Sequence, residues 1–351
     1  MEYKYQVTVG MPVWGVEKYI KRCLLSILEQ DFEDMEVLVV DDCSPDQSIA
    51  ITKEIIQNHP QGQKIKILHQ PQNMGCWAAR NRVIEEAKGK YILLVDSDDY
   101  FAKGAIRKLY QKAEETGVEA TYGSILPVDE NEKPIDNSGV DGINLDNVTL
   151  IGQDKLACFA NSTTHRRNLH NFIWNILLRK DFIENHHLRF RKTKFWDDVL
   201  FNADMQPLIT SAAFISDITY YYVIRANSLS NYQMRKQIKI EEVHQHICNF
   251  QYLKQQCKEL KDKSYYENRM TKINLDMFYI LIGFIRNKNI LTTPLEKKEF
   301  RKAIQHPLDI KDILEFKHYK AINLVFWIMG VLPPYLSYYS IIFVGKLKHL
   351  M

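Results

Sequence analysis

The feature that most constrains the fold is a regular alternation of short apolar runs and amphipathic segments over residues 5–95. The apolar runs have the length and composition of strands in a parallel sheet, and the segments between them carry apolar residues at helical spacing. The predicted strands cover residues 5–9, 36–40, 64–69 and 91–95, and the predicted helices cover residues 17–30, 48–58 and 81–87. Strands and helices that alternate on short connections predict an open α/β sheet with helices on both faces.

The residues most suggestive of a binding site each follow one of these predicted strands. Pro12 is expected to end the first strand, and acidic, amide and glycine residues follow the other three: Asp41, Asp42, Asn73, Gly75 and residues 96–99. Open α/β sheets bind ligands beyond the carboxyl ends of their strands. One such cluster could arise by chance, but four at one edge predict a ligand site there.

The acidic turn Asp96-Ser97-Asp98-Asp99 directly follows the fourth predicted strand. Its three carboxylates repel one another, and Mg²⁺ or Mn²⁺ would relieve that repulsion by taking carboxylate and phosphate oxygens as ligands. Asp96 and Asp98 lie on the same side of an extended chain, so one could hold a nucleotide ribose while the other holds the metal. The alternative is a solvated strand-to-helix turn in which Asp99 caps the next helix.

A second acidic pair, Asp41-Asp42, and a glycine turn lie at the same predicted edge. A carboxylate after the second strand could accept a hydrogen bond from a uracil N–H or a ribose hydroxyl, or it could cap the helix that follows. Within residues 73–81, Gly75 is expected to allow a sharp turn, and Arg80 then lies on the first turn of a helix. Arg80 could pair with a diphosphate or with an aspartate at the strand ends.

Several other protein classes are disfavoured. The chain has no G-x-G-x-x-G after its first strand and no G-x-x-x-x-G-K-S/T sequence, which argues against a dinucleotide dehydrogenase and a P-loop NTPase. Its net charge is only +3 and it lacks a dense Lys/Arg run, so composition gives no support for a nucleic-acid partner. With 46% hydrophobic residues, the composition is that of a globular protein rather than a disordered one.

The second half of the chain is predicted to be largely helical. Residues 127–147 are rich in Asp, Asn, Gly and Pro and are typical of a loop, and residues 153–222 form a mixed region. Apolar residues at helical spacing predict a long amphipathic helix over residues 238–261 and another helix over residues 272–285. A basic stretch, His165, Arg166, Arg167 and His170, could face a phosphate-bearing acceptor, although a solvated loop is the simpler interpretation.

Residues 321–344 form an uncharged tail rich in aromatic residues. Its length is that of a membrane span, but Pro333-Pro334 in its middle would break a helix. We therefore expect two short apolar helices that lie in or dip into one leaflet. The lysines on either side would favour an anionic cytoplasmic surface: Lys311, Lys317, Lys320, Lys346 and Lys348. The alternative is a helix pair that closes the core or forms a dimer interface.

Together these residues resemble the family 2 glycosyltransferases over roughly residues 5–230, through ordered motifs that are far more specific together than singly. The motifs are residues 7–14, 19–28, 39–44, 73–81 and 91–99, with later signatures at Trp174-Asn175, Phe190, 196–201 and 222–230. The resemblance implies the GT-A fold, a Rossmann-like nucleotide-binding α/β fold with an open mixed sheet flanked by helices, followed here by a helical C-terminal extension. The expected organisation is a glycosyltransferase domain over residues 1–235 (nucleotide-sugar half 1–125, acceptor and base half 126–235), a helical extension over 236–317, and an apolar membrane-associating tail over 318–351.

The resemblance also assigns roles to individual residues. The nucleotide-sugar site is expected to hold Pro12, Val13, Trp14, Glu17, Asp42, Asn73, Gly75, Arg80, Asp96 and Ser97. The first three of these would line the base pocket, Asp42 would contact the base, and Asp96 would reach the ribose or uridine. Asp98 would bind the Mn²⁺ or Mg²⁺ that bridges the diphosphate. Asp197-Asp198 stands where the family usually carries Glu-Asp, so Asp198 inherits the role of catalytic base and Asp197 that of its acidic partner.

The implied reaction is an inverting, metal-dependent transfer of a sugar from a nucleotide-diphosphate donor to an acceptor hydroxyl. The metal stabilises the leaving diphosphate, and a carboxylate removes the acceptor's proton as the hydroxyl attacks C1. We expect a UDP-sugar donor, a glycan or lipid-linked glycan acceptor in cell-surface polysaccharide assembly, and a peripheral position at the cytoplasmic face of the inner membrane; a homodimer stays open. The alternatives are a non-catalytic sugar-nucleotide-binding scaffold and a sugar nucleotidyltransferase, although residues 10–18 lack the basic, Gly-rich phosphate loop of the latter.

Overall fold

The computed structural model describes residues 2–135, 144–162, 169, 172–225 and 237–350. The chain divides into two compact units, one of residues 1–160 and 165–225 and the other of residues 161–164 and 226–351. Each unit buries its own set of apolar side chains.

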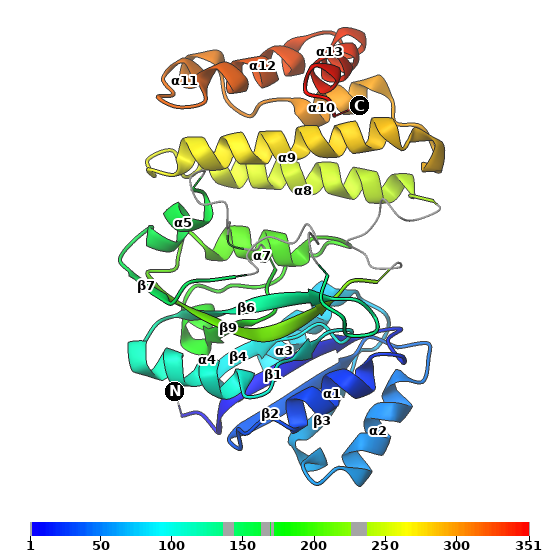
Figure 1. Cartoon of the computed structure of the whole chain (residues 1–351). Coiled ribbons are helices and arrows are strands. Elements are labelled where there is room, and N and C mark those ends of the chain that lie inside the picture. The colour runs from blue at the N-terminus through cyan, green and yellow to red at the C-terminus, as the bar shows by residue number, and fades with distance from the viewer. Residues whose placement is uncertain (1, 136–143, 163–168, 170–171, 226–236, 351) are drawn as a thin grey trace. The chain divides into compact units, whose positions relative to one another are not determined.

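The first unit is built on one mixed sheet, which contains nine strands among the residues that the structure describes (Figure 1). The strands are β1 (Tyr5–Val13), β2 (Met35–Asp41), β3 (Ile65–His69), β4 (Gly89–Leu94), β5 (Tyr100–Phe101), β6 (Ala120–Val128), β7 (Val148–Ile151), β8 (Ile176–Arg179) and β9 (Ser211–Val223). Their order is β3-β2-β1-β4-β8-β6-β9-β5, and β7 also pairs with β9. The first four strands along the chain are parallel, whereas β8 is antiparallel to both β4 and β6. The expected open mixed sheet is confirmed.

Helices cover both faces of this sheet because successive side chains of a strand point to opposite faces. In β2, Val37 and Val39 belong to one core, while Leu38 and Val40 belong to the other. The first core also takes side chains from α1 (Ile20–Leu28), α2 (Ser48–Asn58) and α4 (Ala105–Thr116). The second takes them from α3 (Cys76–Glu86), α5 (Lys155–Ala160), α6 (Lys180–Asn185) and α7 (Asp197–Met205).

The first strand does not end at Pro12, contrary to the sequence prediction. It continues to Val13, and Pro12 pairs with Val40 of β2. The carbonyl of Gly10 accepts a hydrogen bond from Val95 on the β4 side of the strand. The backbone nitrogen of Pro12, two residues further along, points to the same side of the strand as that of Gly10. The ladder between β1 and β4 ends at Gly10, before Pro12 is reached. The missing N–H of the proline therefore costs no ladder hydrogen bond.

Two glycines allow α3 to begin at Cys76, earlier than the predicted start at residue 81, and to pack closely on β1. Gly75 precedes the helix with a φ of +93°, a conformation that residues with a Cβ rarely adopt. A Cβ on Gly10 would lie 2.2 Å from Cγ1 of Val83 in α3, so only glycine permits this approach. The approach fixes the helix that carries Arg80 against the sheet.

The second unit is helical in the part that the structure describes. Its α-helices are α8 (Ile240–Lys258), α9 (Tyr266–Arg286), α10 (Lys297–Ile304), α11 (Ile310–Leu314), α12 (Lys320–Val331) and α13 (Pro334–Leu347). The two predicted long helices correspond to α8 and α9. The C-terminal tail forms the two short helices expected, with Pro334 at the first position of α13, where proline's missing N–H is tolerated.

The two tail helices bury one face within this unit. Phe326, Met329 and Ile341 are buried, and the rings of Phe326 and Phe278 in α9 lie 5.8 Å apart. The alternative of a helix pair that closes the core is therefore right for these inner faces. Among the described residues, no helix combines the length and apolar character needed to cross a bilayer.

Candidate active site

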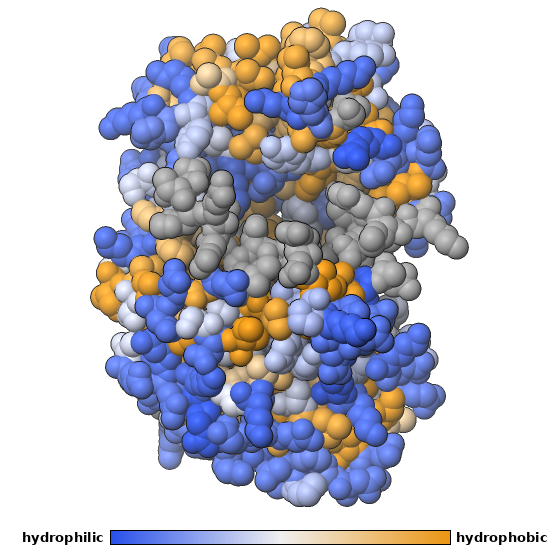
Figure 2. Space-filling model, in the orientation of Figure 1, coloured by the Kyte–Doolittle hydropathy of each residue, from blue (hydrophilic) through white to orange (hydrophobic). Residues whose placement is uncertain are grey.

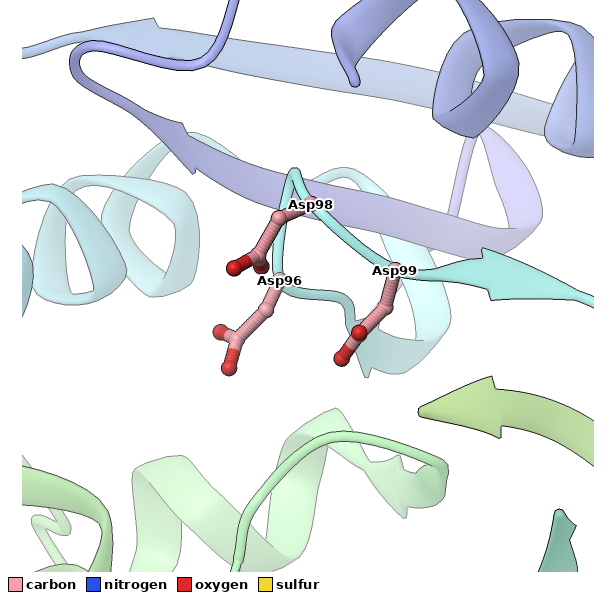
Figure 3. A group of neighbouring side chains, drawn as sticks. All are labelled: Asp96, Asp98 and Asp99. Carbon is pink, nitrogen blue, oxygen red and sulfur yellow. The ribbon is translucent and has the colours of Figure 1, made fainter. Parts of the chain in front are cut away.

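The acidic turn after β4 brings three carboxylates together at the carboxyl edge of the parallel strands. Oxygens of Asp96, Asp98 and Asp99 all lie within 4.8 Å of one another, and the side chains project from one short turn between β4 and β5 (Figure 3). Ser97, between them, is buried. Such a set of oxygen ligands matches the preference of Mg²⁺ and Mn²⁺.

Each of the three carboxylates has a different partner. Asp96 Oδ1 accepts a hydrogen bond from Arg80 Nη2 at 2.7 Å, and Asp98 forms an ion pair with Arg225. Burial raises the pKa of Asp98, an effect that Arg225 opposes and the neighbouring Asp96 reinforces. Burial and Asp96 therefore favour the protonated form of Asp98, whereas the ion pair with Arg225 favours its ionised form.

Asp99 anchors the last strand of the sheet. Its oxygens accept hydrogen bonds from the Tyr220 hydroxyl at 2.9 Å and from the Val223 N–H at 2.7 Å. Burial, together with Asp98 and Asp96, raises the pKa of Asp99 well above its usual range. The alternative in which Asp99 caps the next helix is wrong, because Gly104 precedes α4 and the short strand β5 intervenes.

Arg80 joins the acidic turn to the later acidic motif. Its Nη1 donates to Asp197 Oδ2 at 2.8 Å while its Nη2 donates to Asp96. The guanidinium is 4% exposed and lies 5.6 Å from the centre of the Phe190 ring. The sequence suggested two partners for Arg80, a diphosphate or an aspartate at a strand end. The structure shows the second, because both terminal nitrogens of the guanidinium donate to carboxylates.

Asp198 lies beside this bridge, in the first turn of α7. It is half-buried, and its Oδ1 accepts a hydrogen bond from the Val199 N–H at 2.8 Å. Burial raises the pKa of Asp198 to about 7, with Arg80 opposing the shift and Asp197 and Asp96 adding to it. A carboxylate with this pKa can take up a proton near neutral pH, which is the property required of a general base.

The end of β1 and the loop after it are fixed by side chains from the loop after β2 and from the start of α2. Pro12 is half-buried, Val13 is fully buried and Trp14 is 55% exposed. The next three N–H groups, those of residues 15–17, donate to the side chains of Ser44, Ser48 and Asp46. Glu17 returns the contact by accepting from the Gln47 N–H at 3.1 Å. Trp14 therefore presents its ring to solvent from a firmly held loop.

Asp42 holds the loop before α3. Its two oxygens accept hydrogen bonds from the N–H groups of Met74 at 2.7 Å and Gly75 at 2.8 Å, next to the exposed Asn73. The alternative in which the Asp41-Asp42 pair caps the next helix is wrong, since Asp46 accepts from the Ser48 N–H at the start of α2.

Two residues of this site, Arg225 and Tyr220, were not predicted from the sequence. Arg225 pairs with Asp98, and the Tyr220 hydroxyl accepts from the Asp96 N–H at 3.2 Å while donating to Asp99. The available signal for Arg225 was its place within the family signature at residues 222–230. Residues 226–230 of that signature, and the basic residues His165, Arg166, Arg167 and His170, lie outside the described residues.

Comparison with known proteins identifies the class of this domain. Residues 8–176 match the Glycosyl transferase family 2 sequence model, so this part of the chain is a family 2 glycosyltransferase domain. The chain is 33% identical over 126 residues to glycosyltransferase GlyG of Streptococcus pneumoniae, which covers 36% of this chain and 41% of GlyG. It is 29% identical over 231 residues to glycosyltransferase GlyA of the same organism, covering 64% of this chain and 31% of GlyA. The match thus spans less than half the length of either relative.

Solved structures share the fold. The crystal structure of S. aureus TarS 1–349 in complex with UDP-GlcNAc superposes with a TM-score of 0.62 at 20% identity, covering 93% of this chain and 90% of that one. This likeness, together with the strand order, confirms the GT-A fold.

Proposed function

We propose that this chain is an inverting, metal-dependent glycosyltransferase that moves a sugar from a UDP-sugar to a hydroxyl of a glycan or lipid-linked glycan in cell-surface polysaccharide assembly. One observation carries the proposal: Arg80 joins the acidic turn at Asp96 to the acidic motif at Asp197, at the carboxyl edge of the parallel strands. Donor-binding and base candidates, from distant parts of the sequence, thereby meet in one site. We place the protein at the cytoplasmic face of the inner membrane.

The donor's base would bind at the end of β1, between Pro12, Val13 and Trp14 and the loop that Asp42 fixes. Support comes from the exposed Trp14 ring on its anchored loop and from the TarS structure, which contains UDP-GlcNAc. Asp42 holds two backbone N–H groups, so it would shape this pocket as well as contact the base. Asn73 and Gly75 would border the pocket on the same loop, and Glu17 would hold its far side.

Asp98 would hold Mn²⁺ or Mg²⁺, with Asp96 beside it, in agreement with the closely spaced oxygens of the turn. When bound, such an ion supplies Lewis-acid stabilisation of the charge that develops on the departing diphosphate. Asp99 contributes differently, because both of its oxygens already hold β9. We assign Asp99 to positioning the turn.

Asp198 would act as the catalytic base. Deprotonated above its pKa of about 7, it would accept the acceptor hydroxyl's proton as that oxygen attacks C1, and a single displacement then inverts the anomeric centre. Asp197 would serve as a positioning residue. Its carboxylate is 9% exposed and already paired with the Arg80 guanidinium, and this ion pair would fix the start of α7 and with it the neighbouring Asp198.

The proposal is tested by thermal unfolding with UDP, GDP, CMP and dTDP, each with Mn²⁺ and with EDTA. A ligand that binds the native state raises the unfolding midpoint by mass action. We expect a rise with UDP and Mn²⁺ that is lost with EDTA and in Asp98→Ala. Absence of a shift with every nucleotide would overturn the proposal, and a shift that Asp98→Ala leaves intact would overturn the metal assignment.

A further inference from the structure

The outer sides of the two tail helices expose a set of apolar side chains, which is called the stripe below. In α13 the exposed side chains recur every fourth residue, at Tyr335, Tyr339, Phe343 and Leu347, with exposures of 45–63%. This spacing places them along one side of a helix. The neighbouring α12 adds exposed aliphatic side chains: Val325, Ile328 and Val331. Figure 2 shows apolar surface gathered over the region of these helices.

The two helices that carry the stripe are packed on the rest of the helical unit, so the stripe is exposed although the tail is folded. The inner faces of the same helices are buried, the rings of Phe300 in α10 and Tyr338 in α13 lie 5.0 Å apart, and Arg301 Nε donates to the Gly330 carbonyl at 3.1 Å. A Cβ on Gly330 would lie 2.7 Å from the Cα of Gln305, so the packing depends on glycine there. The helices are held on the unit by one side and present the other to the surroundings.

The charges within the tail segment itself are all of one sign. From residue 316 to the end of the sequence there is no Asp or Glu, while Lys317 and Lys320 precede the apolar segment and Lys346 and Lys348 follow it. All four lysines are exposed. A fifth, Lys297 in α10, lies over the Tyr335 ring, 4.4 Å from its centre. An apolar stripe that is rich in aromatic residues, and whose own segment carries only cationic side chains, complements an anionic surface with an apolar layer beneath it.

We propose that the α12–α13 stripe docks on an anionic lipid bilayer, with both helices parallel to its surface. Tyrosine suits the boundary between the headgroups and the apolar layer of the bilayer, because its ring enters the apolar layer while its hydroxyl stays hydrated. Lysines gain from the negative headgroups. A second copy of the chain fits less well, because a two-fold interface brings the same patch of each copy together and would set lysines against lysines.

This inference gives the proposed membrane position a defined surface, and it does not require the proposed reaction. It is tested by flotation of the full chain with vesicles of phosphatidylcholine alone and of phosphatidylcholine mixed with phosphatidylglycerol. We expect the chain to float with the mixed vesicles. The doubly substituted Tyr339→Glu, Phe343→Glu protein should bind them about tenfold more weakly or worse, since two buried apolar groups are lost.

Two further variants separate the contributions. Lys346→Glu and Lys348→Glu should each weaken binding to the mixed vesicles by about fivefold or more, because each lysine near an anionic surface contributes by this factor. Each should reduce the preference over phosphatidylcholine alone by a similar factor. Tyr279→Glu is the matched control, since Tyr279 in α9 is also exposed, at 51%, but lies outside the stripe. It should float like the unsubstituted chain.

The inference is overturned if the unsubstituted chain floats with neither kind of vesicle, or if the stripe variants float as it does. It is also overturned if light scattering shows a dimer that Tyr339→Glu, Phe343→Glu converts to a monomer while no vesicle is bound. The substituted side chains are exposed, so thermal midpoints should stay unchanged. A UDP-dependent rise in midpoint that persists in the stripe variants separates failure of this inference from failure of the proposed reaction.

Discussion

Arg80 Nη1 donates a hydrogen bond to Asp197 Oδ2 at 2.8 Å, although the two residues are 117 positions apart in the sequence. The other end of the same guanidinium binds Asp96. The fork geometry of arginine allows one buried cation to satisfy two carboxylates from different elements. The bridge therefore fixes the acidic turn and the start of α7 relative to each other within the first unit.

Loss of this bridge should destabilise the protein strongly. Arg80→Ala leaves two carboxylates without their buried cation, and breaking a buried pair from one side typically costs about 3–5 kcal/mol. Arg80→Lys should recover only part of this, because an ammonium lacks the planar fork. Denaturant unfolding measures both. Arg82→Ala on the same helix removes an exposed ion pair with Glu86 and should change stability by no more than about 1 kcal/mol; an equal loss in the two alanine variants would contradict the structural role of Arg80.

Asp98→Asn should weaken the binding of Mn²⁺ in the presence of UDP. Loss of a residue that only supports a metal ligand typically lowers metal affinity by roughly 10- to 100-fold, and loss of the ligand itself should lower it by more. The reason is that an amide oxygen carries no charge to hold the ion. Titration calorimetry provides the measurement. The control is Asp217→Asn, whose exposed carboxylate pairs with Lys108 at the surface. Equal Mn²⁺ affinity in the Asp98 variant and the control would place the metal elsewhere.

Asp198→Asn should lower the turnover rate by about 10²- to 10⁴-fold, the contribution of a general base, and leave UDP binding intact. In the unsubstituted protein the rate should rise with pH and level off above about 7, since only the ionised carboxylate accepts a proton and its pKa is about 7. Steady-state rates across pH provide the measurement. Asp204→Asn, on the same helix and paired with Arg191, should keep the normal profile; a profile unchanged in Asp198→Asn would exclude it as the base.

The helical unit should become more stable as pH rises above neutrality. Lys254 is 3% exposed, donates to the carbonyls of Ala303 and Gln305, and has its pKa lowered by burial to about 7. Between about 7 and the unfolded value near 10.4, the unfolded chain binds the extra proton, so stability rises with pH by at most about 1.4 kcal/mol per pH unit. Unfolding measured at several pH values should show this slope in the unsubstituted chain and a shallower one in Lys254→Met. If the free energy of unfolding rises equally steeply with pH in both proteins, Lys254 is charged in the folded protein and the prediction is wrong.

The alternating strands and helices, and the edge at which the site lies, could be predicted from the sequence. Both follow from local patterns: runs such as residues 36–40 alternate their side chains between two cores, and acidic residues directly after parallel strands must meet at one edge. The break between α12 and α13 was equally local, because proline cannot continue a helix. Two predicted boundaries were wrong. The first strand continues past Pro12 because it pairs there with β2, and α3 begins earlier than predicted because Gly75 adopts a positive φ just before it.

What each charged group does was decided only by the tertiary structure. The sequence left Arg80 with two possible partners and offered a helix cap as one role for Asp99. In the fold, Arg80 donates to two carboxylates and Asp99 accepts a hydrogen bond from the Tyr220 hydroxyl. Ion pairing and burial depend on groups that long-range packing brings within a few ångströms, and desolvation sets pKa values such as that of Asp198. Spacing along the chain determines which residues reach the edge of the sheet; packing determines their partners, their charge and therefore their chemistry.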